Sequence, residues 1–517
     1  MTAVASGADV LLAGDYATLS DLVRAYAAER PDHPAVIDTD GLLTYGQLDA
    51  RADRVAAALQ RDGATKAVSI VSSSRNDYVT VYLGALRAGL AVAPLAPSSL
   101  PEQIVAMAQD ADAQHLFLDA DNELALRGVL ADLPPSRIRL DTSQFEQWLA
   151  PEGTKPAPVK LTPEMPFNII YSSGTTGTPK GIVQSHGMRW LHMQRANLYG
   201  YDRKAVTLLS TPLYSNTTLV SLFPTLAGGG TAVLMAKFDV VKYLELAQRY
   251  RVTHTMLVPV QYSRVMAHPD FGNYDLSRFR AKFCTSAPFN AALKADILKR
   301  WPGKLIEYYG MTEGGGTCIL VADEFPDKLH TVGRPAEGHD IRLITEDGKP
   351  AAPGEIGEIV GHSGAIMTHY HKQPGKTAEA EWFDETGKRF IRTGDLGRFD
   401  EDGFLQLMDR RKDMVISGGF NIYPSDLEAV LRGHEAVADV AVVGVASEQW
   451  GETPVAFVVV RPGVTITAPE LLLWANAKLG KMQRISAIEF RDQLPRSAIG
   501  KVLKRELRDE YAKAAQK

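Results

Sequence analysis

The residues best suited to chemistry lie between Tyr171 and Gly181, in the segment Y-S-S-G-T-T-G-T-P-K-G, directly after the apolar run Phe167 to Ile170. Backbone N–H groups and hydroxyls of such a loop can wrap phosphate oxygens, and Lys180 adds a point charge. It is not a Walker loop, because the only Gly-Lys-Thr, at 375–377, has Tyr370 in place of the first glycine. A flexible Gly/Thr linker would need no strand before it and no lysine after it. The phosphate-binding candidates are Ser172, Ser173, Gly174, Thr175, Thr176, Gly177, Thr178 and Lys180.

Further motifs follow this loop along the chain. They are Thr285-Ser286-Ala287-Pro288, Tyr308-Tyr309-Gly310-Met311-Thr312-Glu313, Thr393-Gly394-Asp395-Leu396, Asp409-Arg410-Arg411-Lys412-Asp413, Ser417-Gly418-Gly419-Phe420-Asn421-Ile422-Tyr423-Pro424 and Pro495-Arg496-Ser497-Ala498-Ile499-Gly500-Lys501. In type and order this set resembles the adenylate-forming superfamily: acyl-CoA synthetases and ligases, adenylation domains and luciferases. The resemblance implies an enzyme that uses ATP to form an acyl-adenylate and pyrophosphate.

The resemblance also implies the residues that act on the α-phosphate. Negative charge gathers there in the transition state, so cations and hydrogen-bond donors must be placed in advance. Lys501 looks like the family's adenylation lysine, which bridges the carboxylate and the phosphate. Thr312 would donate to the α-phosphate, and Glu313 would hold Mg²⁺, a cation that prefers oxygen ligands. The predicted catalytic residues are therefore Lys501, Thr312 and Glu313.

Nucleotide contacts are implied on both sides of these residues. Ser286, Ala287 and Pro288 would form a small-residue surface on which adenine lies flat. Tyr309 would stack on the adenine, although a tyrosine packed in a core is the competing interpretation. Asp395 resembles the acid that holds both ribose hydroxyls, in a turn after the strand Phe390 to Arg392. The other predicted nucleotide contacts are Tyr308, Gly310, Met311, Thr312 and Arg410.

The family performs a second half-reaction by turning a small C-terminal domain about a hinge. Lys412 occupies the hinge position, and Gly418 and Gly419 would let the pantetheine of CoA pass close to the backbone. Trp450 resembles a residue near the CoA nucleotide. Residues 478–517 hold eleven Lys or Arg against five acids, which fits either a solvated basic face or contact with CoA phosphates.

The acyl pocket is predicted at Tyr214, Ser215, Gly314 and Gly315. Ser215 stands where many relatives have a gate histidine, so Tyr214 and Tyr171 are left as alternative gates. The following residues include no acid that would pair with an amino group, which favours uncharged carboxylic acids over amino acids. Only sixteen residues follow Lys501, so we expect no carrier domain and a free thioester as product.

The main functional hypothesis is an AMP-forming acid–CoA ligase for a short- or medium-chain aliphatic acid or an aromatic acid. ATP, Mg²⁺ and CoA are the expected cofactors. Alternatives are a luciferase-like oxygenase that uses the same adenylate, a stand-alone adenylation enzyme for another acceptor, and a silent nucleotide-binding module. The last is disfavoured because Lys180, Glu313, Asp395 and Lys501 are all present.

The elements that must position these residues alternate between helix and strand. Helical and strand patterns alternate from residue 17 to 150, which predicts an α/β fold with parallel strands. From about residue 339, strands separated by Asp-Gly and Pro-Gly turns predict a small β unit. Ser425 and Glu428 form a capping-box pattern for a helix that ends at Gly433. We expect two domains, 1–411 for ATP and the acid, and a mobile α+β domain at 412–517.

Composition limits the other possibilities. The 517 residues are 45% hydrophobic and 23% charged, which is typical of a folded globular protein. The net charge of −5 argues against bulk binding of nucleic acid or anionic membrane. Two cysteines are too few for a disulfide framework, and no apolar run is long enough for a membrane span. We expect a cytoplasmic monomer or homodimer without a secretory signal.

Overall fold

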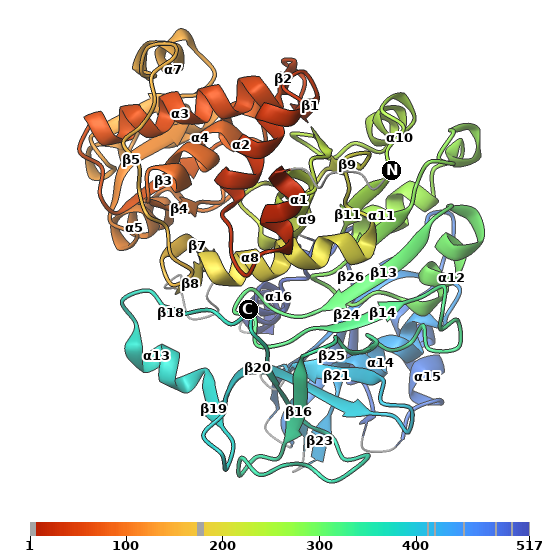
Figure 1. Cartoon of the computed structure of the whole chain (residues 1–517). Coiled ribbons are helices and arrows are strands. Elements are labelled where there is room, and N and C mark those ends of the chain that lie inside the picture. Colours follow the sequence, from red (N-terminus) through yellow and green to blue (C-terminus); the bar gives the residue numbers. More distant parts are fainter. Residues whose placement is uncertain are drawn as a thin grey trace. The chain divides into compact units, whose positions relative to one another are not determined.

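The structure is a computed structural model that describes residues 7–172, 180–410, 413–417, 420–447, 450–480, 483–497 and 500–515. The chain divides into two compact units (Figure 1). The first comprises residues 1–329, 335–340 and 361–391, and the second comprises residues 330–334, 341–360 and 392–517. The predicted boundary between 411 and 412 falls on residues outside the description and stays a prediction.

Two large sheets carry the chemistry-bearing segments of the first unit. The seven-stranded sheet has the order β18 (His369–Tyr370), β8 (Lys180–Ser185), β7 (Pro166–Ser172), β4 (Ala91–Pro94), β3 (Ala67–Val71), β5 (Ala113–Leu118) and β6 (Ser136–Arg139). The nine-stranded sheet has the order β15 (Arg334–Pro335), β14 (Cys318–Val321), β13 (Lys304–Tyr309), β12 (Ala281–Cys284), β11 (His254–Leu257), β9 (Val206–Leu209), β10 (Thr231–Leu234), β1 (Pro34–Ile37) and β2 (Leu42–Thr44). Most neighbouring strands run parallel, as the alternating pattern predicts.

Helices connect these strands, and several begin at capping boxes that the sequence encodes locally. Thr18 with Asp21 and Thr44 with Gln47 cap the two longest of the first three helices. The helices are α1 (Gly7–Ala13), α2 (Leu19–Glu29), α3 (Tyr45–Arg61), α4 (Asn76–Arg87), α5 (Pro101–Asp110), α6 (Ala120–Ala125), α7 (Ser143–Trp148), α8 (His186–Gln194), α9 (Asn216–Ala227), α10 (Val240–Arg249), α11 (Pro259–Met266), α12 (Ala291–Arg300) and α13 (Pro374–Glu379). Short 3₁₀ turns are η1 (Leu130–Asp132), η2 (Arg195–Tyr199) and η3 (Phe271–Asn273).

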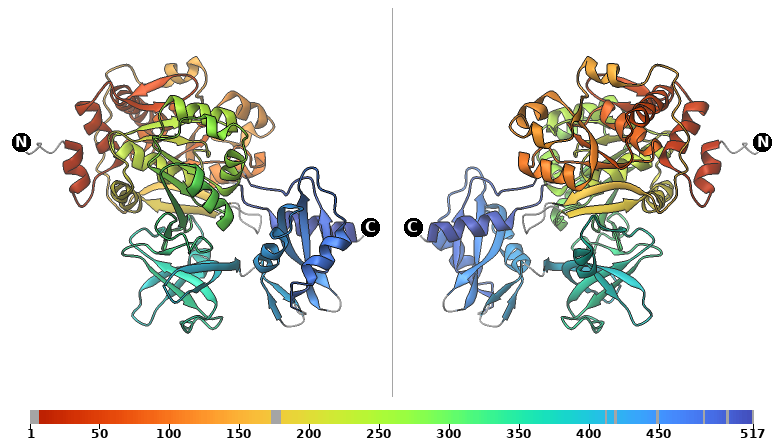
Figure 2. Two further views of the ribbon diagram at one scale, coloured as in Figure 1. Left: turned by 90° about the vertical axis from the view of Figure 1, so that its right-hand side faces the viewer. Right: turned by 90° about the vertical axis from the view of Figure 1, so that its left-hand side faces the viewer.

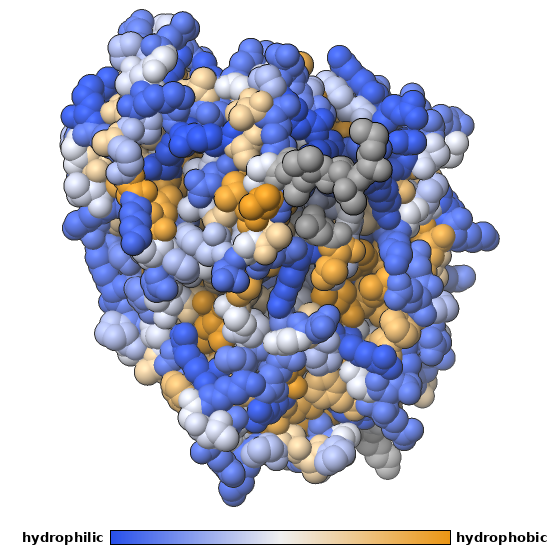
Figure 3. Space-filling view, viewed as in Figure 1, coloured by the Kyte–Doolittle hydropathy of each residue, from blue (hydrophilic) through white to orange (hydrophobic). Residues whose placement is uncertain are grey.

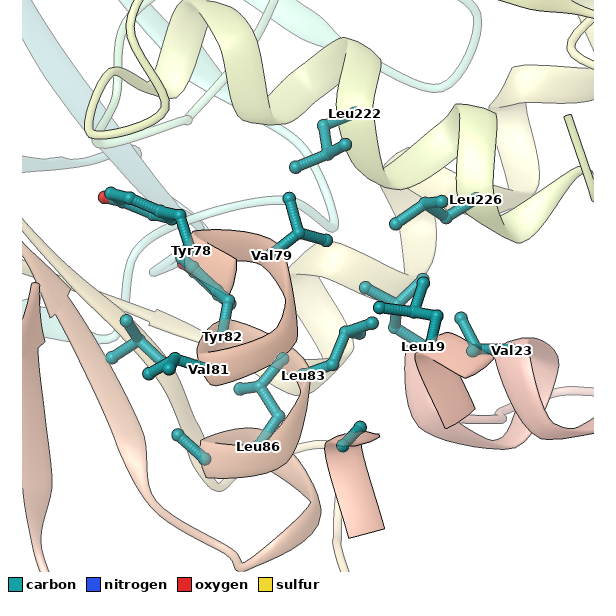
Figure 4. Close-up of a cluster of buried hydrophobic side chains, with 14 of the residues drawn as sticks. Leu19, Val23, Tyr78, Val79, Val81, Tyr82, Leu83, Leu86, Leu222 and Leu226 are labelled. Carbon is teal, nitrogen blue, oxygen red and sulfur yellow. The ribbon is translucent and has the colours of Figure 1, made fainter. Parts of the chain in front are cut away.

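The main hydrophobic core draws side chains from both sheets and from α2, α4 and α9. Leu19 of α2, Leu83 of α4 and Leu226 of α9 are at most 1% exposed and point toward one another (Figure 4). Burial of each such side chain stabilises the fold by about 1.5–3 kcal/mol. This packing fixes α9, and with it the Tyr214–Ser215 segment that leads into the helix.

A smaller sheet follows in the chain and confirms the predicted β unit. It has the order β16 (Asp340–Ile344), β17 (Gly357–His362), β20 (Arg389–Phe399) and β19 (Glu381–Phe383), and β21 (Leu405–Arg410) also pairs with β20. Asp395 therefore lies inside the long strand β20, not in a turn after Arg392 as predicted. Gly394 has φ +70°, and the strand register shifts after Asp395. These irregularities explain why the sequence predicts a turn at this point.

The C-terminal segment has its own sheet and two cores. The strand order is β23 (Phe420–Ile422), β22 (Val415–Ser417), β25 (Gly451–Val460) and β24 (Val437–Ser447), with β26 (Ala487–Phe490) beside β25. Helices α14 (Pro424–Arg432) and α15 (Ala468–Asn476) contribute to one core, and α16 (Lys504–Ala515) contributes Leu507 to the other. Figure 2 shows this segment, in blue, with helices beside its strands. The fold class predicted from the sequence is confirmed.

The predicted capping box at Ser425 is wrong. The helix begins two residues earlier than an N-cap at Ser425 would place it, because Pro424 suits the first helical position, and Tyr423 is its N-cap. The Ser425 hydroxyl donates to the carbonyl of Met408 instead. Glu428 accepts from the N–H of Val442 at 2.9 Å and pairs with a lysine of α16, so it joins the helix to its neighbours.

The surface and the cysteines agree with the composition. Hydrophilic residues predominate on the face in Figure 3, and hydrophobic ones form separate small groups. Cys284 and Cys318 are buried free thiols, and burial raises the pKa of both. Among the residues that the structure describes, no helix is both long and apolar enough to cross a membrane.

Candidate active site

Part of the predicted site lies outside the described residues. This applies to Ser173, Gly174, Thr175, Thr176, Gly177 and Thr178 of the phosphate loop, to the hinge residue Lys412, and to Gly418 and Gly419. The side chains of Ser172 and Arg410 also lie outside the description. The described site residues divide between the units, with Lys180, Ser286 and Glu313 in the first and Asp395, Trp450 and Lys501 in the second.

The phosphate loop is held at both ends by its flanking strands. It joins β7 to β8, which pair antiparallel with Ser172 opposite Lys180. Before the loop, the Tyr171 hydroxyl donates to Asp110 Oδ2 at 2.6 Å, at the end of α5. After the loop, Lys180 Nζ lies 5.0 Å from the centre of the Tyr370 ring, close enough for a cation–π contact. The loop therefore begins and ends at fixed side chains.

The Thr312–Glu313 motif lies just beyond the end of β13 and is tied to the same region. Gln184 Nε2, on β8, donates to the Thr312 carbonyl at 2.6 Å, and the N–H of Met367 donates to the Glu313 carbonyl at 2.8 Å. The Tyr370 hydroxyl donates to Glu313 Oε1 at 2.7 Å. Burial, followed by the charge of Glu313, raises the pKa of Tyr370 far above its usual value, so this hydroxyl keeps its proton. The motif and Lys180 are thus brought together by Tyr370.

Glu313 has the chemistry that a divalent cation requires. Within the described part of the chain, no lysine, arginine or histidine pairs with its carboxylate, and Tyr370 engages only one of the two oxygens. A partly exposed carboxylate without an ion pair is a ligand that suits Mg²⁺. The residues present therefore fit the predicted metal.

The predicted adenine surface contains an unusual backbone conformation. Ser286 has φ +81°, a left-handed conformation that costs a residue other than glycine about 1–3 kcal/mol. Its hydroxyl is hydrogen-bonded to that of Thr217, with an oxygen–oxygen distance of 2.7 Å, which links this turn to the first turn of α9. Ala287 is partly exposed and Pro288 is exposed. The strained turn leaves the small-residue surface accessible at the end of β12.

The two tyrosines before Gly310 differ in their surroundings. The Tyr308 ring stacks on Phe283 with centroids 5.5 Å apart and meets Tyr199 edge-on at 5.9 Å. Burial raises the pKa of Tyr308. Tyr309 is half-buried and pairs with Cys318 across β13 and β14. Tyr308, and not Tyr309, is therefore the tyrosine that packs among aromatic side chains. The nucleotide contacts of both residues stay predictions.

The predicted acyl-pocket residues have structural roles that the sequence did not indicate. Ser215 is buried and caps α9 by accepting from the N–H of Thr217 at 3.3 Å. Tyr214 is half-buried, and burial raises its pKa. Gly314 and Gly315 have φ +74° and +87°, and a Cβ on Gly314 would lie 2.0 Å from the Ala365 carbonyl oxygen. Close packing therefore accounts for Gly314, and the acyl-pocket role of all four residues stays a prediction.

In the second unit, Lys501 is held through its backbone. The N–H of Ser497 donates to the Lys501 carbonyl at 2.8 Å, and Arg496 Nη1 donates to the Gly500 carbonyl at 2.6 Å. Arg496 also pairs with Asp439 of β24, which links these residues to the C-terminal sheet. Trp450 is 45% exposed, an unusual fraction for this residue type and one that leaves its ring available to a ligand.

Two residues in these contacts were not identified as site residues from the sequence: Gln184 and Tyr370. Each belongs to a segment without a recognised motif, and each contacts a site residue distant in the sequence, 57 positions away for Tyr370 and Glu313. Only Gln184 could have been indicated by the sequence, because its strand directly follows the phosphate loop.

Comparison with known proteins gives consistent matches. Residues 23–371 match the family described as AMP-binding enzyme, and residues 426–501 match the AMP-binding enzyme C-terminal domain. The chain is 32% identical to a feruloyl-CoA synthase of Amycolatopsis sp, over 93% of this chain and 96% of that protein. It is 29% identical to a fatty acid–acyl-carrier-protein ligase of Streptomyces coeruleorubidus, over 96% of both. Among solved structures, an amide bond synthetase from Marinactinospora thermotolerans matches with a TM-score of 0.85 and 27% identity, over 95% of this chain and 99% of that one.

Proposed function

The chain belongs to the adenylate-forming superfamily of AMP-binding enzymes, and from this premise we propose that it joins an apolar carboxylic acid to coenzyme A. The predictions of the family and of an AMP-forming ligase of the acyl-CoA synthetase class are confirmed. The proposal concerns this chain's own acid and acceptor. It also includes the predicted roles of individual site residues.

One observation carries the proposal: Lys180 and Glu313 meet at Tyr370, next to the predicted phosphate loop, and Gln184 holds the Thr312 carbonyl beside them in the chain. A lysine and a carboxylate without an ion pair at one place are what a nucleoside triphosphate with its metal requires. Glu313 would hold Mg²⁺, which neutralises phosphate charge when bound. Lys180 would bind phosphate oxygens, and Thr312 would donate to the α-phosphate.

Two balanced steps follow. A carboxylate oxygen of the acid forms a bond to the α-phosphorus of ATP, and the bond to pyrophosphate breaks. The thiol of CoA, losing its proton, then forms a bond to the carbonyl carbon, and AMP leaves. Lys501 would stabilise the charge of the first step, and Asp395 and Arg410 would hold the ribose. Trp450 and the loop at Gly418 and Gly419 would receive CoA in the second step.

Two features favour an apolar acid. Phe283 and Tyr308 stack on each other and pack with Tyr199, which places three aromatic rings together near the ends of β12 and β13. The start of α9 offers Ser215, Asn216 and Thr217, with no acid to pair with an ammonium group. The similarity to a feruloyl-CoA synthase supports aromatic acids, although aliphatic acids stay in the proposal.

A second acceptor has specific support. The amide bond synthetase and the acyl-carrier-protein ligase resemble this chain over nearly its whole length, so an amine or a carrier-protein thiol is the alternative to CoA. Adenylation is common to all three acceptors, and they differ only in the second step.

The test is pyrophosphate release across a panel of carboxylic acids with ATP and Mg²⁺, followed by product analysis with each acceptor. We expect release with an aromatic or medium-chain acid and a thioester only when CoA is added. An amide or an acylated carrier protein instead would replace CoA as the acceptor, and light emission with O₂ would favour the luciferase-like alternative. If no acid in the panel released pyrophosphate, the proposal would be wrong.

A further inference from the structure

Tyr370 is a buried side chain that touches two charged residues of the proposed nucleotide site. Its hydroxyl is 2.7 Å from Glu313 Oε1, and its ring centre is 5.0 Å from Lys180 Nζ. Neither the phosphate-loop motif nor the Thr312–Glu313 motif contains it. One aromatic side chain therefore lies between the proposed metal-binding carboxylate and the proposed phosphate-binding lysine.

The backbone around Tyr370 leaves this side chain little freedom. Residues 369 and 370 form β18, in which Tyr370 pairs with Ile182, two residues after Lys180. The N–H of Tyr370 donates to Thr377 Oγ1 at 3.0 Å. Its ring is 4% exposed and packs with Ile182, Met367 and Ile391. A side chain fixed in this way can transmit its position to the groups that it touches.

The segment that carries Tyr370 also holds the backbone of the motif. The N–H of Met367 donates to the Glu313 carbonyl at 2.8 Å, and the N–H of Gly315 donates to the Ala365 carbonyl at 3.3 Å. On the other side, the N–H of His371 donates to the Gly181 carbonyl at 2.7 Å. Residues 365–371 thus join the end of the phosphate loop to the turn at Glu313, with Tyr370 as the side-chain link.

The two ends of the side chain have different chemical effects. The hydroxyl donates to Oε1 only, which fixes the rotation of the carboxylate and leaves Oε2 available to a cation. Partners of this kind, which orient a metal ligand without touching the metal, commonly affect metal affinity strongly. The ring attracts the Lys180 ammonium through its face and can hold that side chain before phosphate arrives.

We propose that Tyr370 is a positioning residue for nucleotide binding: its hydroxyl orients Glu313 for a divalent cation, and its ring holds Lys180 for the phosphates. This inference rests on the proposed function, because it requires that Glu313 and Lys180 receive a metal and ATP. It assigns separate tasks to the two ends of one side chain, and the hydroxyl can be removed while the ring stays.

The experiment uses the full chain and measures binding, not turnover. Mn²⁺ replaces Mg²⁺ as a paramagnetic probe, and its affinity for the protein–ATP complex is measured by electron paramagnetic resonance. ATP affinity without metal is measured by calorimetry in EDTA. Tyr370→Phe removes only the hydroxyl, and Tyr370→Leu removes the ring as well. Tyr243→Phe is the matched control, because it removes another buried hydroxyl, hydrogen-bonded to Thr255 at 2.9 Å.

We expect Tyr370→Phe to weaken Mn²⁺ binding to the ATP complex about tenfold while ATP affinity in EDTA stays as in the wild type. Tyr370→Leu should weaken both, and Tyr243→Phe should weaken neither. Unfolding curves establish that each variant is folded, and Tyr370→Met replaces Tyr370→Leu if the latter does not fold. A purely structural Tyr370 would change the unfolding curves and leave both affinities of the folded variants unchanged.

The outcomes separate this inference from the proposed function. If the wild type binds Mn²⁺ with ATP and Tyr370→Phe binds it equally well, the role of the hydroxyl is wrong. Unchanged ATP affinity of the folded ring-deletion variant in EDTA would overturn the role of the ring. If the wild type itself shows no metal-dependent ATP binding, the proposed function fails.

Discussion

At the scale of single residues, a buried polar group fixes the geometry of its neighbours at a cost in folding free energy. His254 is fully buried beside Tyr201 and Phe283, and its ring stacks on Tyr201 with centroids 4.6 Å apart. Its Nε2 lies 2.9 Å from the Tyr199 carbonyl and must carry the proton to donate to it, so Nδ1 faces Thr253 at 2.7 Å. The neutral ring completes the aromatic group behind Tyr308.

This histidine makes stability depend on pH. Burial lowers the pKa of His254 to about 4. In the unfolded chain its pKa is about 6.5, so between these values the unfolded state binds a proton that the folded state does not. The resulting contribution to the free energy of unfolding is therefore present above about pH 6.5 and is lost as the pH falls toward 4, by up to about 3 kcal/mol.

His254→Gln should remove this pH dependence. The difference in the free energy of unfolding between wild type and variant should shrink as the pH falls from 7 to 4, measured by urea unfolding. His330→Gln is the control, because His330 is exposed. A difference that stays constant with pH would contradict the assignment of a neutral buried ring.

At the scale of elements, the sequence predicts what local signals determine. The apolar run from Ala91 to Pro94 predicts a strand, which has these bounds in the structure. The amphipathic pattern from Tyr45 to Gly63 predicts a helix, which ends two residues earlier, at Arg61. Capping residues and apolar periodicity are local, so they can be read from the chain. Ser425 was misassigned because Pro424 starts the helix first.

The candidate site shows the same division between local and distant signals. Lys180, Thr312 and Glu313 stand in contiguous motifs and were predicted. Tyr370 contacts Glu313 across 57 positions of sequence, and its position depends on the pairing of β18 with β8. Such pairing is not encoded in any short segment, which is why the link became evident only in the folded chain.

The turn after Glu313 is an element whose glycine has a testable cause. In Gly314→Ala the new Cβ would lie 2.0 Å from the Ala365 carbonyl oxygen, on a backbone with φ +74°. Gly63→Ala has nearly the same conformation, φ +72°, with nothing within 4 Å of the new Cβ. Left-handed conformation alone costs alanine about 1–2 kcal/mol, so the control isolates this part.

We expect Gly63→Ala to lower the free energy of unfolding by about 1 kcal/mol and to leave ATP binding unchanged. Gly314→Ala should lower it by about 3 kcal/mol or more, because backbone must also move. That movement displaces Glu313, so metal-dependent ATP affinity should fall as well. Equal losses in calorimetric unfolding for the two variants would show that the close approach of residue 365 is unimportant.

At the scale of the whole molecule, the site residues are distributed over two compact units with separate cores. The first unit holds Lys180 on β8 and Glu313 just beyond the end of β13. The second holds Lys501 next to Gly500, whose carbonyl accepts from Arg496, and Trp450 directly before β25. If two half-reactions use different residues of the second unit, as the superfamily resemblance implies, then substitutions in that unit should affect one half-reaction each.

Lys501→Ala and Trp450→Ala should therefore impair different half-reactions. Loss of the Lys501 charge removes stabilisation of the first transition state, so ATP–pyrophosphate exchange should fall at least about 100-fold. The same variant, supplied with synthetic acyl-adenylate and CoA, should form thioester at a rate near that of the wild type. Trp450 is 45% exposed and supports no core, so Trp450→Ala should leave exchange intact and raise the KM for CoA. Both steps are measured on the same preparations. If Lys501→Ala slowed thioester formation from the adenylate as strongly as it slowed exchange, Lys501 would serve both steps, and the division of labour within the second unit would be wrong.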